Sequence, residues 1–158
     1  MVGNISIDEI ELLNAYNYLN SNCKNHLKDY MRYLLCKQYR REVTEGVFHN
    51  QLLQNLLHGL LYIVERDDFD VHQVRKRVKH IKELYYGIFE QIHYRYIQVV
   101  SDLDTNETVR EFGKNSFDNL ERVLNGNDIN SIRMEIIDFF QEYTKLAKKH
   151  YSRKIVAV

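Results

Sequence analysis

The chain has 158 residues, of which 44% are hydrophobic and 28% charged, so we expect one globular domain over residues 1–158. Its 22 basic and 22 acidic residues balance, which excludes an overall field that would draw the protein to nucleic acid or to an anionic membrane. A polar start and the lack of any apolar run long enough to span a bilayer predict a cytoplasmic protein with no membrane span.

The first predicted elements are two helices separated by a polar break. The spacing Ser6-x-x-Glu9 is that of a capping box and predicts a helix start, and apolar residues then follow at helical spacing. The run NSNCKN at residues 20–25 predicts the break, and Asn25–Val43 predicts the second helix. We expect this helix to bury Leu27, Met31, Leu34 and Leu35.

The middle of the chain predicts a joint and two further helices. Residues Thr44–Phe48 predict the joint, and the leucine-rich run His49–Arg66 predicts the helix that lies deepest. From Val71 to Leu103, apolar residues recur at spacings of three or four, which indicates one long helix. We expect this helix to bend near Gly87, because a straight rod of that length would project from a compact domain.

The last part of the chain predicts two helices joined by a turn. Asp104-x-x-Glu107 would cap a helix that runs to about Leu124, NGND at residues 125–128 predicts the turn, and the final helix runs from Ile129 to about Tyr151. No stretch alternates like a strand. The predicted class is therefore all-α, with six to seven helices, one of them long and bent.

Basic residues concentrate in the stretch Val74–Gly87. Its ordinary interpretation is a solvated helix face; the functional alternative is a docking surface for an acidic partner around Arg75, Lys79 and Lys82. A nucleic-acid grip would add base-stacking aromatic side chains to the same face, whereas Tyr85 falls on the apolar seam. We therefore expect a protein partner and no nucleic acid.

Two short patterns bear on catalysis and metal binding. Arg75-x4-His80 resembles the Arg-x4-6-His motif of HEPN-family helical ribonucleases, which implies RNA cleavage, although residues five apart diverge by about 140° on a regular helix. The pattern Glu90-x-x-His93 occurs once, whereas a di-iron carboxylate site needs it twice. No nucleophile–base arrangement is evident, so we expect no enzyme and no metal site.

Four residues are candidates for lining a ligand pocket. They place polar or aromatic groups on or beside apolar helix faces: His58, Tyr62, Tyr85 and Phe89. For His58, which lies among leucines, a hydrogen-bonded core histidine is the alternative interpretation.

The segment Leu12–Met31 resembles the start of the non-heme globin sensor domains of Bacillus sporulation kinases. Tyr18-Leu19-Asn20 and Leu27-Lys28-Asp29 match that pattern, Tyr30 takes the position of a tryptophan, and residues 129–151 resemble the closing helix of stressosome sensor globins. The resemblance implies a globin-like fold, a homodimer formed through the last helices and an interior apolar ligand such as a fatty acid. Glu65 and Arg66 stand where a heme-binding sensor globin carries its proximal histidine, so we expect no heme and no other cofactor.

The leading functional hypothesis is a non-catalytic sensor or regulatory domain of a sporulation or stress signalling pathway, binding a small apolar ligand. The alternative is a helical protein-binding adaptor or inhibitor that has a solid core and takes no ligand. The third is a HEPN-like ribonuclease that uses Arg75 and His80.

Overall fold

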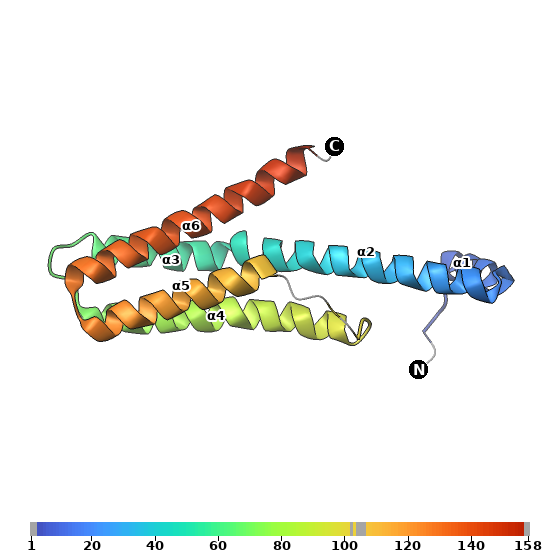
Figure 1. Ribbon diagram of the computed structural model, residues 1–158, viewed down its shortest axis with the longest axis horizontal. Helices are drawn as coiled ribbons and strands as arrows, with labels where there is room; N and C mark the ends of the chain where they lie inside the picture. Colours follow the sequence, from blue (N-terminus) through green and yellow to red (C-terminus); the bar gives the residue numbers. More distant parts are fainter. Residues whose placement is uncertain (1–2, 102, 104–106, 157–158) are drawn as a thin grey trace.

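The computed structural model describes residues 3–101, 103 and 107–156, with the side chains of 107 and 150–156 excepted. Within these residues the only regular elements are α-helices, so the predicted all-α class is confirmed. They are α1 (Ile7–Tyr18), α2 (Ser21–Phe48), α3 (Gln51–Val64), α4 (Val71–Ile97), α5 (Glu107–Gly126) and α6 (Ile129–Val156). Helices α3, α4 and α5 pack together with the C-terminal part of α2 and the N-terminal part of α6, while α1 lies at the far end of α2 (Figure 1).

The first helix starts where its sequence predicts, whereas the second starts at Ser21, four residues before the predicted Asn25. The Ser6 hydroxyl accepts a hydrogen bond from the Glu9 backbone N–H at 3.2 Å, and the Glu9 carboxylate accepts one from the Ser6 N–H at 2.6 Å, which completes the capping box. Asn20 caps α2 by accepting a hydrogen bond from the Cys23 N–H at 2.8 Å. The break between the helices is therefore shorter than predicted, because Asn20 starts the second helix instead of extending the gap.

The predicted joint at Thr44–Phe48 is wrong, because α2 continues to Phe48. Val43, Val47 and Phe48 are all fully buried and carry the inner face of the helix through this stretch. Gly46 contributes close packing: a Cβ there would lie 2.8 Å from Cδ1 of Ile92 on α4. A glycine that indicated a turn in the sequence serves instead to bring two helices together.

The core is formed by the inner faces of α2 to α6 and is rich in aromatic rings. Helix α3 is deeply packed, as predicted, through the buried residues Leu53, Leu57, Leu60 and Val64. Phe117 of α5 lies at the centre, with its ring centroid 5.4 Å from that of Tyr85 and 5.2 Å from that of Phe139. These contacts join the three consecutive helices α4, α5 and α6.

Helix α4 passes through Gly87 without interruption and ends at Ile97, before the predicted end at residue 103. Beyond Ile97 the chain turns, so Val100 enters the core while Val99 is exposed. The predicted cap at Asp104 lies outside the described residues. Helix α5 then packs against α4 at Gly113, where any Cβ would lie 2.7 Å from the ring of Tyr85.

The N-terminal part of the chain projects beyond this packed body (Figure 1). We call α1 and residues 21–38 of α2 the arm. None of residues 3–38 is buried. The predicted burial of Met31 and Leu34 is therefore wrong: they are 44% and 43% exposed, although the neighbouring Leu35 packs partly against the core.

Candidate functional site

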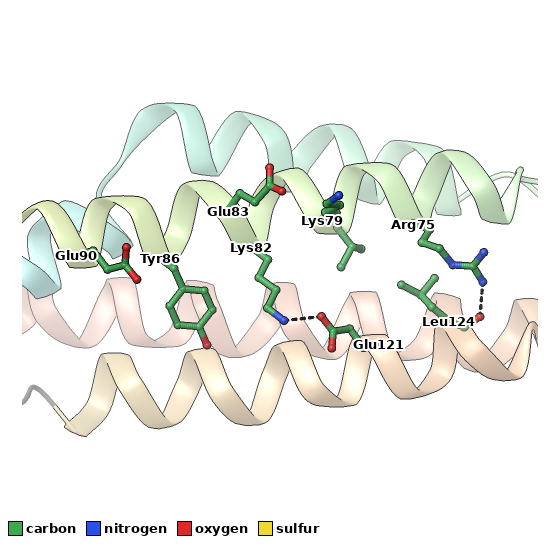
Figure 2. A pocket seen from close by; sticks show the side chains of 9 residues that line it. Arg75, Lys79, Lys82, Glu83, Tyr86, Glu90, Glu121 and Leu124 are labelled. Atoms are coloured by element: carbon green, nitrogen blue, oxygen red, sulfur yellow. Dashed lines mark hydrogen bonds and ion pairs between the residues drawn. The ribbon is translucent and has the colours of Figure 1, made fainter.

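A groove of about 620 Å³ runs along the surface between α4 and α5 (Figure 2). It is lined by Arg75, Val78, Lys79, Lys82, Glu83, Tyr86 and Glu90 of α4 and by Glu121 and Leu124 of α5. On α4 these positions recur at spacings of three or four, which places them on one helix face. Val78 and Leu124 are buried and form an apolar floor beneath the charged side chains.

One end of the groove is held by Arg75. Its Nη2 donates to the Leu124 carbonyl at 2.9 Å and to Oδ1 of Asn127 at 3.3 Å. Leu124 is in the last turn of α5, where free carbonyl groups concentrate negative charge, so a guanidinium is stabilised there. Arg75 therefore fixes the end of α5 against α4 and adds positive charge at this end of the groove.

The middle of the groove is bridged by an ion pair. Nζ of Lys82 lies 2.5 Å from Oε1 of Glu121, and the hydrogen bond that Lys82 donates to this carboxylate raises the pKa of Lys82. Beside it Tyr86 reaches from α4 toward α5, where partial burial raises the pKa of its hydroxyl (Figure 2). The ring of Tyr86 also contacts that of Phe117, with centroids 5.9 Å apart, so this wall is anchored in the core.

Charge is distributed unevenly along the groove. Arg75, Lys79 and Lys82 occupy one half, and Glu83 and Glu90 the other. Lys79 is exposed and forms no ion pair with any described residue, in contrast to Lys82. The groove is therefore a polar track with a basic and an acidic end over an apolar floor.

The structure brings together the three residues predicted to bind a partner, since Arg75, Lys79 and Lys82 all line this groove. Sequence reasoning missed the opposite wall, formed by Glu121 and Leu124. No signal in the sequence identifies them, because residues about 40 positions from α4 become neighbours only through helix packing.

The four residues predicted to line a ligand pocket lie in different surroundings. Tyr85 is buried in the core and donates a hydrogen bond to the Val109 carbonyl, whereas Phe89 stacks on His93 with ring centroids 5.8 Å apart. His58 is exposed with its ring 5.0 Å from that of Phe140, and Tyr62 is exposed beneath the guanidinium of Arg66.

The catalytic and metal patterns gain no partner residues in the described part of the chain. The Arg75 guanidinium is bound to the end of α5, while His80 is exposed and does not line the groove. Among the described residues, no group of three or more histidine, cysteine, aspartate or glutamate side chains is placed to hold a metal ion.

Comparison of the chain with protein-family models, with curated proteins and with solved structures gives no match. The resemblance to non-heme sensor globins therefore stays a prediction. Across the described residues, no helix combines the length and the hydropathy needed to cross a membrane.

Proposed function

We propose that this protein is a non-catalytic helical adaptor, which binds a segment of a partner protein in the groove between α4 and α5. The observation that carries the proposal is the placement of Arg75, Lys79 and Lys82 along one hollow with an apolar floor. Helix-in-groove recognition combines such an apolar floor with charged rims that fix the direction of the bound segment.

The charges of the groove define the partner segment. The lining runs from Arg75 to Glu90, which is about 22 Å of helix at ~1.5 Å per residue and matches a partner helix of about four turns. Its apolar face would lie on Val78 and Leu124, with acidic residues toward Lys79 and basic residues toward Glu90. Glu121 already neutralises Lys82, so Lys79 is the cation that contributes most to binding.

A displayed library of random peptides tests this proposal, because selection on the chain itself requires no identified partner. Peptides selected on the full chain are expected to be amphipathic, with acidic residues at one end, and to bind more weakly as salt rises. Lys79→Glu should weaken their binding about tenfold, since it replaces an attraction of up to about 1 kcal/mol by a similar repulsion. Affinity is measured by fluorescence anisotropy.

Lys76→Glu is the matched control, because Lys76 is exposed on the same helix but does not line the groove. It should leave the affinity within about twofold, the small effect expected of an exposed charge that points outside the groove. Equal losses in the two variants, or selected peptides without charge bias, would exclude the groove as the docking site.

The sensor function is the second proposal, and it requires a change in the core. A hollow among eight apolar side chains, including Leu57, Phe117 and Phe139, has no room for a water molecule, so an acyl chain would have to displace them. If a fatty acid is the ligand, a saturating amount should raise the melting temperature of the purified chain by several degrees. An unchanged melting temperature, together with the absence of an acyl chain from an organic extract, would exclude the sensor function and leave the adaptor function alone.

The cellular setting that we propose follows from the cysteines and from the family resemblance. Cys23 and Cys36 are both free thiols, which suits the reducing cytoplasm. There the adaptor would bind a signalling protein of a sporulation or stress pathway, the setting that the resemblance to non-heme sensor globins implies.

A further inference from the structure

Helix α2 carries two apolar faces that point in different directions. In its C-terminal half, Tyr39, Val43 and Val47 face the core. In its N-terminal half, four residues at i, i+3, i+4 and i+7 form a second apolar stripe, which we call the arm stripe: Leu27, Tyr30, Met31 and Leu34. At 100° per residue, the centres of the two faces lie about 170° apart. The arm stripe is therefore no extension of the core face and needs a different partner.

The apolar surface of this protein is concentrated in the arm. Eleven of the seventeen large hydrophobic side chains described as exposed lie at residues 5–34. Together these side chains expose on the order of 1,000 Å², spread over more than one face of the two helices. A standard interface buries about 800 Å² on each partner, so the arm alone offers enough area for a stable one.

Helix α1 adds an argument from stability. It has 12 residues, none of them buried, and Ile7, Ile10 and Leu13 on one of its faces are exposed. A helix of that length without packing is marginal in water. Its order therefore depends on a surface that covers this apolar face.

The charges of the arm are complementary to those of a second arm. Helix α1 carries three acidic residues and no basic one, whereas residues 21–38 carry four basic residues and one acidic residue. A two-fold axis would set α1 of one copy against α2 of the other and would repeat that pairing on the other side. No foreign partner is needed to explain both charges.

We propose that two copies of this chain associate through their arms, with α1 and residues 21–38 of α2 from each copy forming a four-helix bundle that buries both arm stripes. Four antiparallel helices packed on apolar stripes are a stable arrangement of the required size. The last helices, where the family resemblance implies a dimer, are not used. The grooves between α4 and α5 stay open, so the dimer presents two of them, and its formation does not depend on the adaptor proposal.

The test is the mass of the full chain in solution, measured by light scattering coupled to gel filtration. The wild-type protein is expected at twice the chain mass of 19.1 kDa. Leu34→Glu and Met31→Lys should each weaken the dimer by at least about tenfold, because each places a charge in an apolar interface. Leu52→Glu and Met134→Lys are the matched controls, since Leu52 and Met134 are 55% and 59% exposed outside the arm, and both should remain dimeric.

Cys23 supplies a second measurement that locates the contact. It lies on the same side of α2 as the arm stripe and is exposed, whereas Cys36 is half-buried and can be replaced by serine. A spin label on Cys23 should report a defined distance between copies, which disappears in Leu34→Glu. The same variant should lose helical circular dichroism from α1 while the body keeps its melting transition, which separates dissociation from misfolding.

A wild-type mass of one chain at all accessible concentrations would overturn the proposal. A dimer that Leu34→Glu leaves intact would also overturn it, because the contact would then lie elsewhere on the molecule. Neither result bears on the groove between α4 and α5, because the variants of that groove are tested by their affinity for peptides.

Discussion

Phe117→Ala should lower the free energy of unfolding by about 3–5 kcal/mol, the usual effect of truncating a fully buried aromatic side chain. The Phe117 ring contacts Tyr85 and Tyr86 of α4 and Phe139 of α6, so its removal leaves a cavity where three helices meet. The walls cannot collapse easily, since Gly113 already brings the α5 backbone into contact with the Tyr85 ring. Urea unfolding followed by circular dichroism measures the loss.

Tyr94→Ala is the matched aromatic control for this prediction. Tyr94 is 63% exposed on α4, so its truncation should change the free energy of unfolding by no more than about 0.5 kcal/mol. Comparable losses in the two variants would contradict the core described for Phe117. The Phe117→Ala variant has a further use, because it enlarges the apolar hollow and would reveal whether any acyl ligand can enter there.

Alkaline pH should destabilise the fold through two buried tyrosines. Burial raises the pKa of both Tyr85 and Tyr143, and their hydroxyl groups donate hydrogen bonds to the carbonyls of Val109 and Val47. A raised folded-state pKa contributes stability that is complete below the unfolded pKa of about 10 and is lost as pH rises above it. The free energy of unfolding should fall there by up to about 1.4 kcal/mol per pH unit for each tyrosine.

Urea unfolding at a series of pH values tests this slope, and tyrosinate absorbance follows the ionisation. The double variant Tyr85→Phe, Tyr143→Phe should be less stable at neutral pH by about 0.5–1.5 kcal/mol per lost hydrogen bond, yet flatter above pH 10. Lys82, whose pKa Glu121 raises, adds a dependence of the same sign that the double variant retains. Tyr18→Phe, at an exposed position, is the control. A wild-type profile as flat as that of the double variant would show that these hydroxyls are hydrated.

Several features of the fold could be predicted because they are local. The capping box at Ser6 depends on residues within one turn, and the turn at residues 125–128 depends on a left-handed Asn127, which has φ of 54°. The joint predicted at Thr44–Phe48 failed for a non-local reason. A polar, glycine-containing run resembles a turn in sequence, but here Val43 and Val47 are buried and Gly46 lies close to Ile92 of α4, so the run stays helical.

In the candidate site, too, some features are local in sequence and others depend on helix packing. The basic residues of α4 are evident in sequence, since their spacing alone sets them on one helix face. The sequence does not show that Glu121 would neutralise Lys82, or that the end of α5 would bind Arg75. Those pairings depend on how α5 lies along α4, which is set by the packing of Phe117 and Gly113.

The sequence by itself determined the helical class and the helix starts at Ile7, Val71 and Ile129, because periodicity and capping are properties of neighbouring residues. It also determined which residues of α4 are charged. The tertiary structure alone decided which apolar faces are covered. Leu53 and Leu34 look alike in sequence, yet Leu53 is buried and Leu34 exposed, because Leu34 lies on the side of α2 that faces away from the core. Burial depends on what lies opposite a face, and a one-dimensional pattern does not contain that information.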